Sequence, residues 1–240
     1  MTKTDEVTEV IEPTIVEDSE EISDEQVNEL LQAMQLESGP SEVWEPSTLV
    51  YYGPESRNIL LAADIDTQEA ISIISQIKQL EAEANDEPIF IVINCHGGSI
   101  HDALSIYDAI RGASCPVVTI VEGNCASAAG LIHSAGDVRL CNKHAVFFYH
   151  QPIITEMTVD SPVSIDAATQ HYRWSKETLD ELQRTQYGIT KKAWKKEFGD
   201  STSKYFYAPE ALRLGVVHAI IPYKQKPELK LEEVLEFFFS

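Results

Sequence analysis

Hydrophobic residues recur along the middle of the chain with two alternating periods. Short apolar runs, such as that at 88–94, predict buried strands, and apolar positions three or four residues apart, as at 67–84, predict amphipathic helices. Strands are expected at 58–62, 88–94, 117–121, 138–141, 145–149 and 216–221, and helices at 67–84, 99–111, 164–187, 190–198 and 208–214 and from residue 127 onward. This strand-then-helix order predicts an α/β fold with short crossovers.

The two ends of the chain lack this rhythm. Residues 1–45 contain 14 acidic residues against one lysine, a composition that cannot bury enough apolar surface to order itself. We therefore expect residues 1–42 to be an acidic, disordered tail or a propeptide. Residues 43–225 are expected to form one domain with a helical handle at about 155–190, and residues 226–240 a C-terminal helical tail.

Composition and charge exclude several classes of function. A formal net charge of −21 disfavours binding to a nucleic-acid backbone. No apolar run is long enough for a membrane span and the N-terminal part is too acidic for a signal peptide, so a cytoplasmic protein without membrane partners is expected. Cys95, Cys115, Cys125 and Cys141 have no ligand-like spacing and are expected to be buried reduced thiols. The histidines fit no compact ligand set either, so no metal or other cofactor is expected.

A candidate acyl-transfer site lies in the middle third of the chain. Ser127 stands in a run of small residues, Gly123-Asn-Cys-Ala-Ser-Ala-Ala-Gly130, which predicts a glycine turn and then a helix start. His150 ends a predicted strand and could take the serine proton, which a hydroxyl nucleophile requires. The pair Gly97-Gly98 would let backbone N–H groups approach an oxyanion. Taken singly these are a capping serine, a structural histidine and a tight turn, but together they favour catalysis.

The chain resembles the proteolytic subunit of Clp protease, ClpP, a self-compartmentalising serine peptidase. The resemblance covers roughly residues 50–222. Besides the glycine loop and the serine turn, it includes the segment 103–110, Phe148-Tyr-His-Gln-Pro152 and Ala208-Pro-Glu-Ala-Leu-Arg-Leu-Gly215, in the order of the family. It implies the ClpP/crotonase-like fold, a spiral of ββα units with a protruding helical handle.

The resemblance also implies a function and the residues that perform it. Ser127 would be the nucleophile, His150 the general base, and the amides of Gly98 and Ala128 the oxyanion hole of an endopeptidase that acts on polypeptides. The family assembles into heptameric rings stacked as a tetradecamer and is supplied by a separate AAA+ unfoldase. The chain has no phosphate-binding glycine motif, so an ATP-driven step would have to come from another chain.

The third member of the triad is not defined by the motifs. Counting back from the segment 208–215 places the family's aspartate position at Ser203, whereas counting forward from residue 190 brings Asp200 close to it. Asp200 is our candidate for orienting His150, and a backbone carbonyl or a water molecule is the alternative.

Departures from the family leave two further functions open. Cys95-His96 replaces the usual Ser-Pro before the glycine pair, and residues 153–162 replace a glycine-rich strand. A catalytically inactive ClpP-like subunit of a mixed ring is an alternative function, because Ser203 stands where the family has its aspartate. A crotonase-type acyl-CoA enzyme is a weaker one, because acyl-CoA hydration requires no serine nucleophile.

Overall fold

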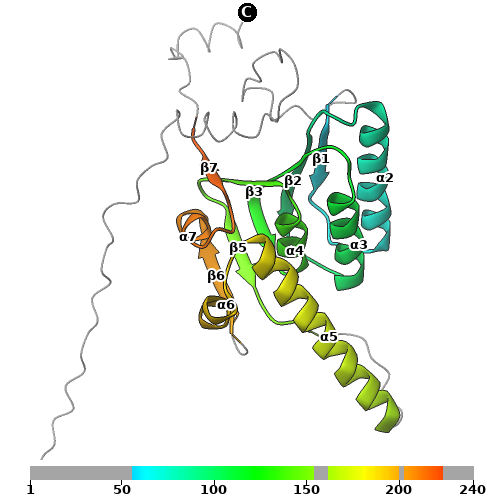
Figure 1. Cartoon of the computed structure of the whole chain (residues 1–240), viewed down its shortest axis with the longest axis vertical. Coiled ribbons are helices and arrows are strands. Elements are labelled where there is room, and N and C mark those ends of the chain that lie inside the picture. The colour runs from blue at the N-terminus through cyan, green and yellow to red at the C-terminus, as the bar shows by residue number, and fades with distance from the viewer. Residues whose placement is uncertain (1–55, 154–161, 200–202, 224–240) are drawn as a thin grey trace, which may run out of the picture. The chain divides into compact units, whose positions relative to one another are not determined.

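The computed structural model describes residues 56–153, 162–199 and 203–223 (Figure 1). The predicted acidic tail, the C-terminal tail and Asp200 lie outside these residues, as does the first part of the predicted handle. The proposed domain boundaries therefore stay predictions.

The described residues form an α/β fold, as predicted. The strands are β1 (Asn58–Leu61), β2 (Ile89–Cys95), β3 (Val117–Ala126), β4 (Val138–Asn142), β5 (Val146–Tyr149), β6 (Lys204–Tyr207) and β7 (Ala219–Ile221). The helices are α2 (Thr67–Glu83), α3 (Ile100–Arg111), α4 (Ala128–Ser134), α5 (Pro162–Gln186), α6 (Lys191–Phe198) and α7 (Ala208–Arg213). Each helix and strand predicted within the described residues is present, with boundaries that differ by a few residues.

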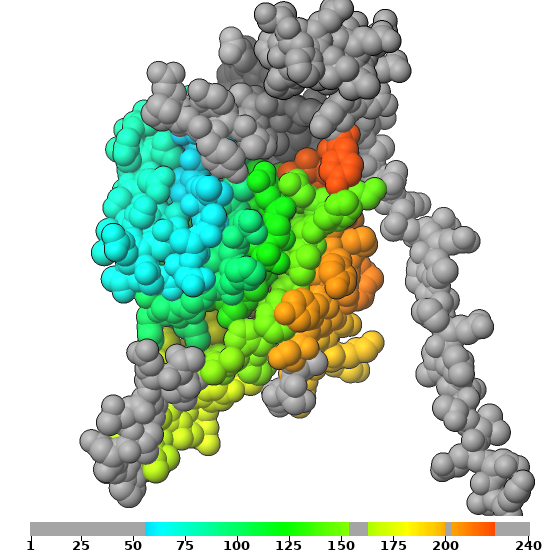
Figure 2. All heavy atoms as spheres, turned by 180° about the vertical axis from the view of Figure 1, so that it is seen from behind, coloured from blue at the N-terminus to red at the C-terminus, as the bar shows by residue number. Residues whose placement is uncertain are grey.

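The sheet is parallel except at one edge. Its strands follow the order β1-β2-β3-β4-β7, and β5 leaves this path by pairing with the second half of β3. Strand β6 is antiparallel to β5, and Figure 2 shows β6 and α7 in orange beside the green segment that contains β5. The candidate site lies at the carboxyl ends of β3 and β5, beside the loop that follows β2.

Strand β3 is twice as long as predicted because it has two successive partners. Its first half pairs with β4 and its second half, 124–126, pairs with β5. The predicted glycine turn at Gly123 is wrong, since Gly123 lies within this strand. The Asn94 side chain occupies the space where a Cβ would be, and its Oδ1 accepts a hydrogen bond from the Asn124 N–H at 2.9 Å. Glycine is thus used here for close packing and not for a turn.

The core covers both faces of the sheet unequally. Alternating residues of β2, among them Ile89, Ile91 and Ile93, join the larger cluster with α2, α3 and α4. Phe90 and Ile120 belong to a second, smaller cluster, which is formed by residues of β2, β3, β4 and β7. Burial of these apolar side chains is the main stabilising contribution to the fold, at about 25 cal/mol per Å².

Helix α5 is the long helix that the sequence predicts as a handle. It runs past the end of the sheet in Figure 1, and three of its large apolar side chains are exposed: Val163 at 77%, Ile165 at 51% and Trp174 at 49%. Such side chains usually indicate an interaction surface when they occur together. Its C-terminal half packs on α4 and ends close to the candidate site.

Candidate active site

Ser127 lies at the turn between β3 and α4 in a conformation that is rare for a residue with a side chain. Its φ is 55° and its ψ is −124°, and among the described residues it is the one non-glycine with a positive φ. Its side chain makes no capping hydrogen bond to α4. The capping interpretation is therefore wrong, and the turn resembles the strained strand-to-helix turns that expose a nucleophile.

The same turn ties Ser127 to the segment that carries His150. The N–H of Ser127 donates to the carbonyl oxygen of Phe148 at 2.8 Å, which continues the parallel pairing of Ala126 with Phe148. Parallel strands end at the same edge of a sheet. Ser127 and His150 consequently follow the ends of two adjacent strands.

The glycine loop after β2 packs directly against the serine turn. A Cβ on Gly97 would lie 2.8 Å from the Cβ of Ser127 and 3.1 Å from the amide nitrogen of Ala128. Gly97 has a φ of 104°, and Gly98 a φ of 150°. These contacts bring the predicted oxyanion loop to the predicted nucleophile.

The loop is fixed by hydrogen bonds to one residue on its far side. The N–H of Ile65 donates to Gly97 O at 2.9 Å, and the N–H of Ser99 donates to Ile65 O at 2.7 Å. In a parallel bridge of this kind the N–H of the residue between them, Gly98, faces the opposite way. Gly98 is an exposed residue, so its N–H is a candidate oxyanion donor.

The cysteine that replaces the family's serine also supports this loop. The Sγ of Cys95 accepts a hydrogen bond from the Gly97 N–H at 3.3 Å and lies 3.1 Å from Ala63 O, to which the thiol donates. All four cysteines are free and buried, which confirms the prediction of reduced thiols. Burial raises the pKa of the Cys95 thiol, so it stays protonated and acts as a structural group.

His150 is oriented by a backbone carbonyl in this structure. Its Nδ1 lies 2.6 Å from Gln151 O, and because a carbonyl can only accept, Nδ1 carries the proton. The neutral ring then has an unprotonated Nε2 that can accept a proton. Ser203 is opposite His150 if the β5–β6 register is continued by one residue beyond Tyr149 and Lys204. No carboxylate bonds to His150 among the described residues, which do not include Asp200.

A partly buried network next to His150 in the sequence was not predicted. The hydroxyl of Tyr149 donates to Asp180 Oδ1 at 2.5 Å and accepts from Gln151 Nε2 at 3.2 Å. Lys176 donates to the other Asp180 oxygen at 2.9 Å. Burial, and then Asp180, raise the pKa of Tyr149. The network joins helix α5 to Gln151, whose backbone carbonyl holds the His150 ring.

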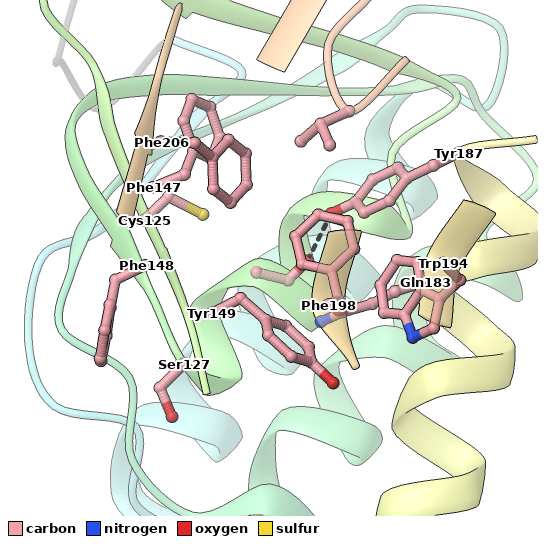
Figure 3. Close-up of a pocket in the computed structure, with 12 residues that line it drawn as sticks. Cys125, Ser127, Phe147, Phe148, Tyr149, Gln183, Tyr187, Trp194, Phe198 and Phe206 are labelled. Carbon is pink, nitrogen blue, oxygen red and sulfur yellow. Dashed lines mark hydrogen bonds between the residues drawn. The ribbon is translucent and has the colours of Figure 1, made fainter. Parts of the chain in front are cut away.

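Aromatic side chains fill the space beside the serine turn. Figure 3 shows Ser127 at the edge of a pocket whose walls are largely aromatic. Phe147 stacks on Phe206, and Tyr149 packs edge-on against Trp194 and Phe198. This cluster anchors β5 to β6 and α6.

In the part of the chain that the structure describes, no three His, Cys, Asp or Glu side chains come together as metal ligands. None of the described helices has the length and apolar character needed to cross a membrane.

A parallel sheet with a strained serine and a histidine at the ends of adjacent strands fits the ClpP-like class of peptidases that the sequence motifs indicate. The family model for Clp protease matches residues 49–224, and the chain belongs to this family of proteases. The expected resemblance and fold class are thereby confirmed.

Three curated relatives have the same name, ATP-dependent Clp protease proteolytic subunit 2. That of Prochlorococcus marinus strain MIT 9312 is 30% identical over 172 residues, which are 69% of this chain and 81% of the relative. Those of subspecies pastoris and strain MIT 9313 are each 30% identical over 169 residues, or 69% of this chain and 82% of each relative. These similarities support a Clp protease and give no support to the acyl-CoA alternative.

Proposed function

We propose that the chain is a serine endopeptidase that cleaves peptide bonds through an acyl-enzyme on Ser127. The observation that carries the proposal is the backbone of Ser127, held at a φ of 55° between the β5 ladder and the glycine loop. A residue in such a conformation costs about 1–3 kcal/mol, which the surrounding structure must compensate. A purely structural role gives no reason for keeping a serine there.

The proposed reaction uses groups whose positions have been described. Ser127 Oγ attacks the peptide carbonyl carbon while His150 Nε2 takes the hydroxyl proton. The tetrahedral oxyanion accepts hydrogen bonds from the N–H groups of Gly98 and Ala128. His150 then gives the proton to the leaving amine, and water hydrolyses the ester by the same route. The N-terminus of α4 contributes partial positive charge near the oxyanion.

His150 needs a group that holds its ring and stabilises the imidazolium. The Gln151 carbonyl can do the first but stabilises the positive charge less than a carboxylate would. Asp200 remains our proposed third residue. An inactive ring subunit is the alternative function, and the observation in its favour is that Ser203 stands at the register position opposite His150.

A fluorophosphonate probe separates the active from the inactive subunit. The probe should label Ser127 in the assembled protein, as located by mass spectrometry of the adduct, and Ser127→Ala should remove the label. A peptidase assay of Asp200→Asn beside Ser203→Ala then tests the third residue. Absence of labelling at Ser127 in the assembled wild-type protein would leave the inactive subunit as the function.

We also propose that the chain forms heptameric rings, stacked as a tetradecamer and fed by an AAA+ unfoldase. The exposed apolar side chains Val163, Ile165 and Trp174 of α5 support an interface along this helix. Native mass spectrometry tests the assembly, since a persistent monomer contradicts it. Degradation of a folded protein only when an unfoldase and ATP are added tests the partner.

A further inference from the structure

Two histidines that lie 70 residues apart in the sequence meet on the surface where α3 approaches α5. The Nε2 atoms of His101 and His171 are 3.2 Å apart, whereas their ring centroids are 5.0 Å apart. The two Nε2 edges therefore face each other. Both side chains are exposed, so the pair is open to solvent. We propose that His101 and His171 bind a transition-metal cation, Zn²⁺ in particular.

The separation of the two nitrogens matches what one tetrahedral metal requires. Zinc binds histidine nitrogen at about 2.0–2.1 Å, so two such ligands are about 3.3 Å apart. The 3.2 Å separation lies so close to this value that the metal would need little movement of either helix. Each neutral ring can keep its single proton on Nδ1 and offer the Nε2 lone pair, so the metal takes the place of the hydrogen bond between them.

The type of ligand decides which cations bind. Imidazole nitrogen suits Zn²⁺, Ni²⁺ and Cu²⁺, whereas Mg²⁺ and Ca²⁺ prefer oxygen ligands. No third protein ligand groups with the pair within the described residues, so water would complete the coordination shell. The chain's net charge of −21 adds a favourable long-range field for a cation.

The metal would connect two helices with separate roles. Helix α3 begins directly after the glycine loop, with Ser99 as its N-cap, and α5 runs past the end of the sheet (Figure 1). A bond from Gln186 Nε2 to the Tyr107 hydroxyl, 3.1 Å long, joins the same helices farther along. Zinc at the histidine pair would add a second link and restrain α5 near its middle.

Trp174 provides a signal within the proposed site. Its ring stacks near both histidines, with centroids 6.2 Å from His101 and 5.8 Å from His171. A bound Cu²⁺ ion, which has an open d shell, would quench the fluorescence of an indole at this distance. The chain contains three tryptophans, so Trp174→Phe identifies the part of the signal that comes from this site.

Calorimetric titration of the full-length, tag-free protein tests the affinity. After treatment with EDTA and dialysis, the protein should bind one Zn²⁺ per chain and no Mg²⁺ at the same concentrations. His101→Gln and His171→Gln should each weaken zinc binding at least tenfold. His144→Gln, which changes an exposed histidine paired with Tyr223, is the matched control and should bind as the wild type does. Wild-type affinity in both site variants, or no saturable binding up to about 1 mM Zn²⁺, would overturn the site.

Fluorescence titration with Cu²⁺ then tests the location independently of the affinity. One equivalent of Cu²⁺ should quench the wild type, and both His171→Gln and Trp174→Phe should remove most of this change. Unaltered quenching in Trp174→Phe would show that the metal sits elsewhere and would contradict the assignment. Neither measurement depends on the peptidase activity, so the zinc site can fail or succeed independently of the proposed function.

Discussion

The N–H of Ser127 donates a 2.8 Å hydrogen bond to the carbonyl oxygen of Phe148, two residues before His150. This bond continues the β3–β5 ladder into a turn that would otherwise relax, because Ser127 has a φ of 55°. The strained backbone and the last hydrogen bond of the β3–β5 ladder therefore belong to the same residue, Ser127. The ladder sets where the serine lies relative to the histidine segment, and α4 and the glycine loop hold the turn from the other sides.

The strain at Ser127 should be measurable with two substitutions that both remove the hydroxyl. We expect Ser127→Gly to be more stable than Ser127→Ala by about 1 kcal/mol, since glycine adopts this conformation without a steric penalty. Urea unfolding of the two variants measures the difference. Under the proposed mechanism both should lose about 10³-fold or more in kcat. Equal stabilities would indicate that the turn is unstrained.

Gly98 and Gly188 form a matched pair for testing the oxyanion loop. Both have a positive φ. A Cβ on Gly98 would lie 2.2 Å from Ile65 O, whereas a Cβ on Gly188 would have no neighbouring atom within 4 Å. Gly98→Ala should therefore displace the loop and lower kcat about 10²–10³-fold, the usual cost of losing an oxyanion donor. Gly188→Ala should cost about 1 kcal/mol of stability and leave kcat unchanged. Similar kinetics for the two variants would remove Gly98 from the mechanism.

The sequence predicted the helices and central strands well because their signals are local. Asp66 and Ser99 accept the capping bonds that begin α2 and α3. The buried face of α2 is made by Ala70, Ile73 and Ile77, whereas Ile71 is 61% exposed. Strand β6 was missed because it has only four residues, too few for a clear period, and its pairing depends on β5, more than 50 residues earlier. The extension of β3 was missed for a similar reason, since Gly123 has a turn-like sequence but packs against Asn94.

The residues of the candidate site also differ in whether their signal is local or depends on long-range packing. Ser127, His150 and the glycine pair belong to short motifs whose spacing is readable without a structure. The Gln151 carbonyl on His150 and the hydrogen bond from Tyr149 to Asp180 depend on how β5 meets α5, and the latter pair is 31 residues apart. No local pattern indicates such a contact. The same is true of His101 and His171, which only the packing of two helices brings together.

Tyr149 is expected to act as a positioning residue for His150. Tyr149→Phe removes the hydroxyl that holds Gln151 Nε2 and the Asp180 carboxylate, while leaving the ring packed on Trp194. The Gln151 peptide should then hold the His150 ring less firmly. We expect kcat to fall about tenfold with little change in KM, because alignment for the chemical step is lost and not substrate binding.

The matched control for Tyr149 is Tyr207→Phe. Tyr207 is 59% exposed on β6, so loss of its hydroxyl should alter neither kcat nor KM. Asp180→Asn, which keeps an acceptor for the tyrosine hydroxyl, should retain more activity than Tyr149→Phe. If Tyr149→Phe has wild-type kcat, the network serves folding alone.

His133 should make the protein less stable in mild acid. This residue of α4 is fully buried, and its burial, followed by the charge of Arg139, lowers its pKa to about 3. In the unfolded chain a histidine has a pKa of about 6.5, so below that pH the unfolded state takes up a proton that the folded state does not. The stabilising contribution is complete above about pH 6.5 and falls by about 1.4 kcal/mol per pH unit as the pH decreases toward 3.

Replacing this histidine should reduce by up to one the number of protons that the chain takes up on unfolding in mild acid. His133→Leu removes the group from both states, so its free energy of unfolding should decline less steeply than that of the wild type between pH 6.5 and 5. Urea titrations at several pH values measure the slope, and the exposed His144→Leu serves as the control that should keep the wild-type slope. Carboxylates titrate equally in all three proteins, so they cancel in the comparison. Parallel slopes for His133→Leu and the wild type would mean that His133 becomes charged while the protein is still folded.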